Sequence, residues 1–172
     1  MLLKTRLHIL PILLLALGAS SCHEVPAYDL PSPQGDTLRD NMISANRIIA
    51  KSEDQQIDSY AARRGWQMQR LAGGARVMTT RQGTGAQVDY EDTVAISYSV
   101  EDLAGRTIYP QRTDTVVCGR LQPTRGLDAA LRTLRRGSKA RVILPSEQAF
   151  GVVGDADRIG SRVVLVYDLE VK

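Results

Sequence analysis

The stretch from Gly126 to Gly151, GLDAALRTLRRGSKARVILPSEQAFG, constrains the fold of this chain more than any other part of its 172 residues. Its first half predicts a short helix, because aliphatic and small residues recur at helical spacing and form one apolar face. These residues are Leu127, Ala130, Leu131 and Leu134. Gly137 suits the end of this helix, since glycine readily adopts the left-handed conformation found at many helix ends.

Strand patterns surround this helix. Residues 139–144 become continuously apolar, as in a strand that enters a core, and Pro145 ends the run. Two strands joined by the glycines of 72–74 predict a hairpin. The predicted strands are 66–71, 75–81, 93–100, 106–109, 114–119, 139–144 and 162–171. Together they predict an α+β domain, an antiparallel sheet with one short helix laid across it.

The N-terminus has the pattern of an export signal. Two basic residues precede a mainly apolar run from Leu7 to Leu17, which is too short to span a bilayer permanently. Four small residues then lead to Cys22, a pattern similar to the lipobox of bacterial lipoproteins, although Ala19 stands where such boxes usually carry leucine. We expect a signal peptide over 1–21 and a lipidated Cys22 that anchors the protein in the cell envelope. Plain secretion and an uncleaved anchor are the alternatives.

Charge and residue types exclude several functions. Removing Lys4 and Arg6 with the signal peptide leaves 20 of the 22 basic residues against 19 acidic ones, so nothing indicates a nucleic-acid partner. Both histidines lie near the N-terminus, at His8 and His23, which excludes the usual zinc sites and histidine-activated nucleophiles from the folded body. Cys118 lies in an apolar run and is expected to be buried. We expect no metal and no cofactor.

A tether and a long helix precede the domain. Residues 22–35 contain three prolines and no hydrophobic periodicity, which predicts a tether. Residues 36–65 predict a helix whose apolar stripe must be buried, either against the domain that follows or against a second copy in a homodimer. The stripe consists of Leu38, Met42, Ala45, Ile49, Ile57, Tyr60 and Ala61. The predicted polar face carries Arg39, Lys51, Glu53, Asp54 and Asp58.

Several short motifs then follow one another in a fixed order. They are Ser97-Tyr98-Ser99-Val100, Gly105, Gly126-Leu127, Gly137-Ser138-Lys139, Leu144-Pro145 to Ala149-Phe150-Gly151, and Leu165-Val166-Tyr167-Asp168-Leu169-Glu170-Val171. In this order they resemble the FKBP-type peptidyl-prolyl cis-trans isomerases. The resemblance implies a bent antiparallel sheet wrapped around one short helix, here over residues 66–172. The whole chain also resembles FKBP-like lipoproteins associated with gliding or secretion machinery in Bacteroidetes.

The reaction of that family suits a domain without histidine. Isomerisation twists the amide before a proline against a barrier of ~18–20 kcal/mol and requires neither proton transfer nor a nucleophile. An apolar, water-poor pocket favours the twisted amide, because that form is less polar than the planar one. The implied partners are proline-containing segments of exported proteins.

The resemblance also assigns a pocket. The implied catalytic residues are Tyr98, Phe150 and Tyr167. Phe150 stands in place of the family's tyrosine, and Tyr167 in place of its phenylalanine. The implied substrate-binding residues are Ile108, Tyr109, Val116, Thr124 and Leu127. Ile108 replaces a phenylalanine, Tyr109 an aspartate and Leu127 a tryptophan. Asp114 stands where the family often has an aromatic residue.

Two functions are compatible with these residues. The first is a membrane-anchored isomerase that assists the folding of exported proteins. The second is a catalytically weak or inactive FKBP-like lipoprotein, a binding or assembly module whose altered cleft, marked by Tyr109, Asp114 and Phe150, holds a protein partner.

Overall fold

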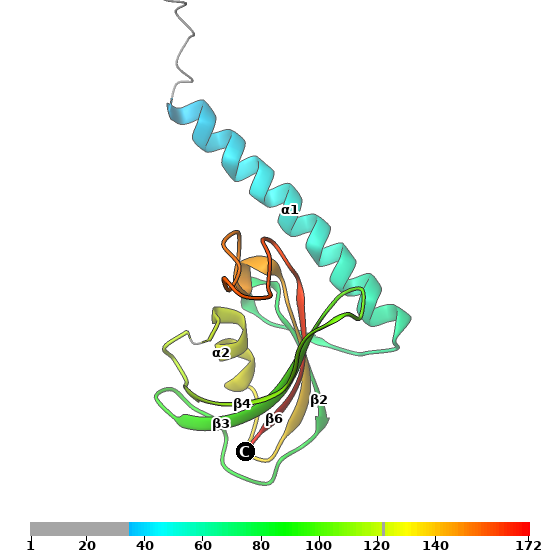
Figure 1. Cartoon of the computed structure of the whole chain (residues 1–172), viewed down its shortest axis with the longest axis vertical. Coiled ribbons are helices and arrows are strands. Elements are labelled where there is room, and N and C mark those ends of the chain that lie inside the picture. Colours follow the sequence, from blue (N-terminus) through cyan, green and yellow to red (C-terminus); the bar gives the residue numbers. More distant parts are fainter. Residues whose placement is uncertain (1–34, 122) are drawn as a thin grey trace, which may run out of the picture.

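A bent sheet wraps around one short helix in the computed structural model, which describes residues 35–121 and 123–172 (Figure 1). The six strands have the order β1-β2-β5-β6-β3-β4, and all neighbours are antiparallel. The strands are β1 Gln69–Arg70, β2 Arg76–Arg81, β3 Thr93–Asp102, β4 Thr107–Val117, β5 Lys139–Leu144 and β6 Leu165–Val171. The helices are α1 Gly35–Arg63 and α2 Arg125–Leu131, with 3-10 turns η1 Ala72–Gly74 and η2 Ser146–Gln148.

The predicted fold class is confirmed: an α+β domain with a long helix in front of it (Figure 1). The predicted signal peptide, the lipidated Cys22 and the tether lie outside the described residues, except that α1 already begins at Gly35. Neither described helix is long and apolar enough to cross a membrane.

The concave face of the sheet packs against α2. Alternate residues of β3 and β6 point to this face, because side chains along a strand alternate between its two sides. Thr124 caps α2, since its Oγ1 accepts a hydrogen bond from the Leu127 N–H at 3.3 Å. Gly126 lets the helix approach the sheet, because a Cβ at this position would lie 2.7 Å from the Leu144 side chain and 2.9 Å from the Gln148 carbonyl oxygen.

Some predicted boundaries were wrong. Helix α2 ends at Leu131, before the predicted stop at Gly137, because the Leu134 carbonyl accepts the Val88 N–H at 3.0 Å and Arg135 forms a β-bridge with Gln87. The predicted strands 106–109 and 114–119 are one continuous strand, β4, whose extra residues are absorbed by bulges opposite β3. The strands predicted over 66–71 and 162–171 are shorter than expected, at β1 and β6.

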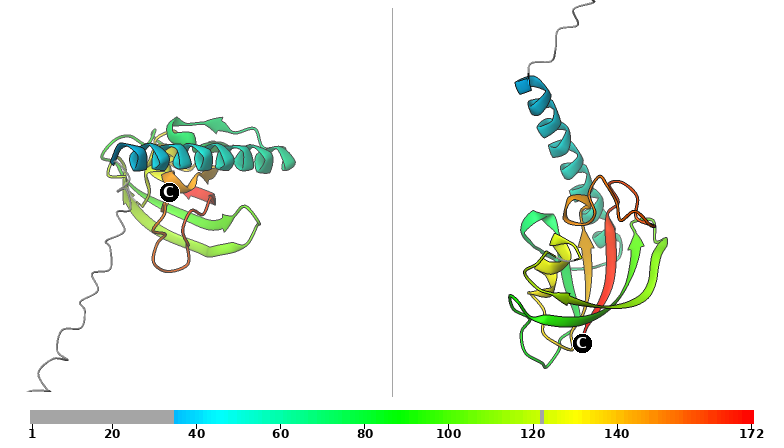
Figure 2. Two further views of the ribbon diagram at one scale, coloured as in Figure 1. Left: turned by 90° about the horizontal axis from the view of Figure 1, so that it is seen from above. Right: turned by 60° about the vertical axis from the view of Figure 1, so that its left-hand side comes forward.

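The C-terminal half of α1 lies on the outer face of the sheet (Figure 2). Ile57 and Tyr60 are buried there and pack in one cluster with Ile143, Val164 and Val166. The Tyr60 ring also meets the Trp66 ring edge to face, with centroids 5.7 Å apart. These contacts confirm that part of the predicted apolar stripe packs against the domain that follows.

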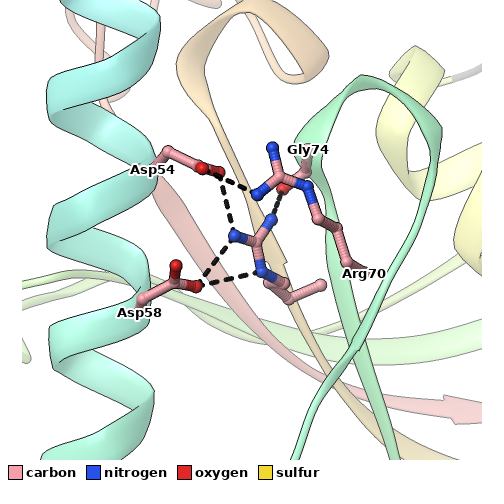
Figure 3. Close-up of polar contacts among 5 residues, drawn as sticks. Asp54, Asp58, Arg70 and Gly74 are labelled. Atoms are coloured by element: carbon pink, nitrogen blue, oxygen red, sulfur yellow. Dashed lines mark hydrogen bonds and ion pairs between the residues drawn. The ribbon is translucent and has the colours of Figure 1, made fainter.

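A buried arginine fastens the same part of α1 to the start of β2. Arg76 is 4% exposed, and its guanidinium contacts Asp54 and Asp58, each at 2.8 Å, as well as the Gly74 carbonyl. Arg70 donates to the other oxygen of Asp54 at 2.7 Å (Figure 3). Burial by itself would raise the pKa of Asp54, but the hydrogen bonds from the two arginines outweigh burial and lower it. The cluster therefore favours the ionised carboxylate.

The N-terminal half of α1 extends beyond the sheet (Figure 1). Leu38 and Met42 are more than half exposed, so the expectation that the domain buries this part of the stripe was wrong. The reason is that this half of α1 projects beyond the sheet, while Ile49, nearer the sheet, is partly buried. Burial of this half by a second copy stays a prediction. Glu53 was wrongly placed on the polar face, since it is only 7% exposed and lies on the docked side.

Candidate functional site

Two tyrosines from neighbouring strands form the base of the candidate site. Val100 of β3 is paired with Tyr167 of β6, which places Tyr98 on the same face one step along the sheet. The two tyrosine rings have centroids 5.7 Å apart and are tilted by 47°. Both side chains are buried, and burial raises both pKa values, that of Tyr98 to about 12. Both phenols are therefore neutral at physiological pH.

The hydroxyl of Tyr98 donates a hydrogen bond to the carboxylate of Asp114. Asp114 is opposite Ile96, and Arg112 is opposite Tyr98, so Asp114 is two residue pairs from Tyr98 along β4 and on the same face of the sheet. After burial, this bond is the largest cause of the raised pKa of Tyr98. Sequence reasoning had noted only that Asp114 replaces an aromatic residue. The structure shows that it orients the tyrosine hydroxyl at the edge of the site.

The tip of β4 supplies a second wall, made of Ile108 and Tyr109. The Tyr109 hydroxyl donates to the carboxylates of Asp155 and Asp157, the latter at 3.0 Å. The hydrogen bond to Asp155, together with burial, raises the pKa of Tyr109 to about 12. Tyr109 thus replaces the carboxylate of the resembled family with a phenol whose hydroxyl is already occupied. The guanidinium carbon of Arg112 lies 4.4 Å from its ring centroid.

Hydrogen bonds order loop 155–159 and join it to Ile108 and Tyr109. Asp155 Oδ1 accepts the backbone N–H groups of Asp157, Arg158 and Ile159 at 2.8–3.0 Å. Arg158 donates to the Ile108 carbonyl at 3.3 Å. Asp155 was missed by sequence reasoning. A signal was available in the polar run Asp155 to Arg158, because aspartate commonly accepts hydrogen bonds from the backbone just after it in a turn.

Leu127 and Val116 form the apolar floor and side of the site. Leu127 is fully buried on α2, and Val116 is 6% exposed on β4. Thr124 is 3% exposed, and its hydroxyl oxygen accepts the Leu127 amide, so its side chain serves to cap the helix.

Phe150 comes from the loop after η2 and packs, half-buried, against the main core. The Ser146 carbonyl accepts hydrogen bonds from the amides on both sides of Phe150, that of Ala149 at 3.1 Å and that of Gly151 at 2.8 Å. The backbone position of Phe150 therefore depends on Ser146.

The structure brings the predicted site residues together. Tyr98, Ile108, Tyr109, Val116, Leu127 and Tyr167 belong to one buried cluster, with Phe150 packed against it. Thr124 is at the start of the helix that carries Leu127. Such a group of aromatic and aliphatic side chains can hold a proline ring and offers little water to the amide beside it. Among the described residues, no group of three or more His, Cys, Asp or Glu side chains could hold a metal ion.

Comparisons with known proteins agree with this geometry. A probable FKBP-type peptidyl-prolyl cis-trans isomerase, FkpA of Neisseria meningitidis serogroup B, is 26% identical over 102 residues. That match covers 58% of this chain and only 38% of the relative.

Two solved structures share the fold. A peptidyl-prolyl cis-trans isomerase of Pseudomonas syringae pv. tomato has a TM-score of 0.60 and 25% identity, covering 73% of this chain and 92% of that one. AtFKBP13 has a TM-score of 0.55 and 18% identity, covering 60% of this chain and 95% of that one, and supports the fold alone.

The sequence family described as FKBP-type peptidyl-prolyl cis-trans isomerase matches residues 84–172. This segment contains all the predicted pocket residues and makes up more than half of the chain. The chain therefore belongs to the FKBP-type peptidyl-prolyl cis-trans isomerase family.

Proposed function

We propose that this protein is a membrane-anchored peptidyl-prolyl cis-trans isomerase that assists the folding of exported proteins. The observation that carries the proposal is the cluster of aromatic and aliphatic side chains at the predicted site, within the segment that matches the isomerase family. The export and lipidation pattern that ends at Cys22 supports the location.

The chemistry follows from the low polarity of the candidate site. A proline ring enters between Tyr98, Phe150 and Tyr167, with Leu127 beneath it, and the amide before the proline leaves water. Because a twisted amide is less polar than a planar one, the loss of water costs the transition state less than the ground state. No side chain has to transfer a proton, so the two neutral tyrosines can serve as walls and hydrogen-bonding groups.

The test is the rate at which the protein accelerates cis-to-trans conversion of an Ala-Leu-Pro-Phe peptide. We expect acceleration by the wild type and a loss of about tenfold or more in Phe150→Ala, since a wall of the pocket is removed. Val153→Ala is the matched control, because Val153 is 88% exposed and three residues away in the same loop. No acceleration at micromolar protein would refute the enzymatic proposal.

A second candidate is a non-catalytic module that binds a protein partner, such as the envelope machinery indicated by the resemblance to gliding-associated lipoproteins. It is favoured by one observation: the hydroxyls of Tyr98 and Tyr109 are both committed to carboxylates of the protein itself. This function predicts binding of proline-containing peptides, measured by calorimetry, without any acceleration of isomerisation.

The anchor and a homodimer are separate parts of the proposal. Cys22→Ser is expected to release the protein from the membrane fraction if Cys22 carries the lipid. The exposed side chains of Leu38, Met42 and Ile48 on the projecting half of α1 support pairing with a second copy. Met42→Glu should then convert the dimer to a monomer in sedimentation experiments, and a wild-type monomer would refute the pairing.

A further inference from the structure

Glu53 of α1 is joined to the loop that carries Phe150. One carboxylate oxygen accepts the Ser146 N–H at 2.8 Å, and the other accepts the Ser146 hydroxyl at 2.6 Å. Both residues are buried, Glu53 with 7% and Ser146 with 1% of its surface exposed. Burying a carboxylate is costly unless it is hydrogen-bonded, and here both oxygens of Glu53 bond to Ser146. Since Glu53 is not one of the predicted site residues, this contact needs its own explanation.

Ser146 links this contact to the candidate site. It is the first residue of η2, and its carbonyl accepts the amides of Ala149 and Gly151, which flank Phe150. Glu53 therefore accepts hydrogen bonds from the N–H and the hydroxyl of Ser146. The carbonyl of Ser146 in turn accepts hydrogen bonds from the amides that flank Phe150. Two successive sets of hydrogen bonds therefore connect α1 to the backbone on both sides of Phe150.

Helix α1 has other contacts with the domain besides this one. The helix is also held by Ile57 in the outer apolar cluster and by the ion pairs of Arg76 with Asp54 and Asp58. These contacts lie on the helix after Glu53 and do not involve the η2 loop. Substitutions can therefore remove the bonds to Ser146 while leaving these docking contacts in place.

We infer that Glu53 is a positioning residue for the isomerase site, through which α1 keeps the Phe150 loop in its substrate-binding conformation. This inference rests on the proposed isomerase activity. Without the carboxylate, the two donor groups of Ser146 are left buried without a partner, and the loop moves to expose them to water. The Phe150 wall then no longer has one fixed position against the proline ring.

The test compares Glu53→Ala with Glu53→Gln in the full chain. Glutamine can accept the Ser146 N–H with Oε1 and donate from Nε2 to the Ser146 hydroxyl oxygen, so both residues stay joined by two hydrogen bonds. The second bond then runs in the opposite direction, and only the Ser146 hydroxyl proton loses its acceptor. We expect kcat/KM for the proline peptide to fall about tenfold in Glu53→Ala, as for a displaced binding group, and to be restored in part in Glu53→Gln, which still holds the Ser146 N–H.

Ile57→Ala is the control for helix docking. It removes a fully buried side chain from the outer cluster and leaves the Glu53 contact in place. The fluorescence of Trp66, the only tryptophan, reports whether the end of α1 is still packed. We expect Ile57→Ala to lower the free energy of unfolding. It should keep the wild-type kcat/KM under conditions in which Trp66 fluorescence shows that the helix is still packed. Equal losses of kcat/KM in Ile57→Ala and Glu53→Ala would overturn the inference.

Amide hydrogen exchange tests the inference independently of turnover. Glu53→Ala should speed exchange of the Ala149 and Gly151 amides about tenfold or more while leaving the β5 amide of Val142 unchanged. If the wild type does not isomerise proline but Glu53→Ala still speeds exchange of these two amides, the proposed function is refuted. The conclusion that Glu53 positions the Phe150 loop is then still supported. If exchange at Ala149 and Gly151 is unchanged, the inference is wrong whatever the activity.

Discussion

Replacing Tyr98 with phenylalanine is expected to change how the stability of the protein depends on alkaline pH. Burial and the hydrogen bond to Asp114 raise the pKa of Tyr98 from 10.0 to about 12 in the folded state. The folded protein thus binds this proton more tightly than the unfolded chain does. The corresponding stability is fully present below pH 10 and is lost as the pH rises towards 12.

The size of the effect follows from the shift in pKa. Two pKa units correspond to at most about 2.7 kcal/mol of unfolding free energy, since each unit is worth about 1.36 kcal/mol. Tyr98→Phe cannot ionise, so this loss is absent from its stability curve. At neutral pH the variant is expected to be less stable by about 1.5–3 kcal/mol, because it lacks a hydrogen bond to a charged group. The gap between the two proteins should therefore close as the pH rises.

Urea unfolding followed by circular dichroism between pH 8 and pH 12 measures this gap directly. Tyr90→Phe is the control, because the Tyr90 ring is 62% exposed, and its curve should run parallel to that of the wild type. A difference between wild type and Tyr98→Phe that stays constant from pH 9 to pH 12 would refute the reasoning.

Three further substitutions test the packing. Leu127→Ala should lower the free energy of unfolding by about 3–5 kcal/mol, since Leu127 is fully buried, and a loss below 1 kcal/mol in urea titration would contradict this. Arg76→Met should cost about 1–3 kcal/mol and shift Trp66 fluorescence, because the bonds to α1 and to the Gly74 carbonyl are lost. Gly154→Ala should lower the melting temperature, because Gly154 has a φ of +75° and a Cβ would lie 2.1 Å from the Ile159 carbonyl oxygen; an unchanged melting temperature would show that the loop can rearrange freely.

The elements that sequence patterns predicted best are those whose signal is local. The alternation in β3 and the apolar spacing in α2 each depend on residues a few positions apart, and β3 and the first part of α2 formed where expected. The end of α2 was misjudged, because the Val88 and Gln87 backbone contacts that replace its last turn come from a distant segment. Periodicity contains no information about such contacts.

Hydrogen bonds between distant segments were harder to predict than the positions of the site residues. The pocket positions could be carried over from a family pattern, whereas Glu53 and Ser146 are 93 positions apart and meet only because α1 crosses the outer face of the sheet. A partial signal existed, since Glu53 precedes Ile57 by four residues and Tyr60 by seven and so shares their side of the helix. Its charge alone suggested the solvated side.

Strand β4 is one of the two edge strands of the sheet, β1 being the other, and its free side is open to an extended polypeptide. Pro110 has no N–H to offer to such a chain, the neighbouring bulge interrupts the regular spacing, and Arg112 and Asp114 add exposed charges. These features resist the addition of a foreign strand. For a protein proposed to meet unfolded clients, the consequence is that a client can bind at the candidate site without pairing with the edge of the sheet, which would promote aggregation.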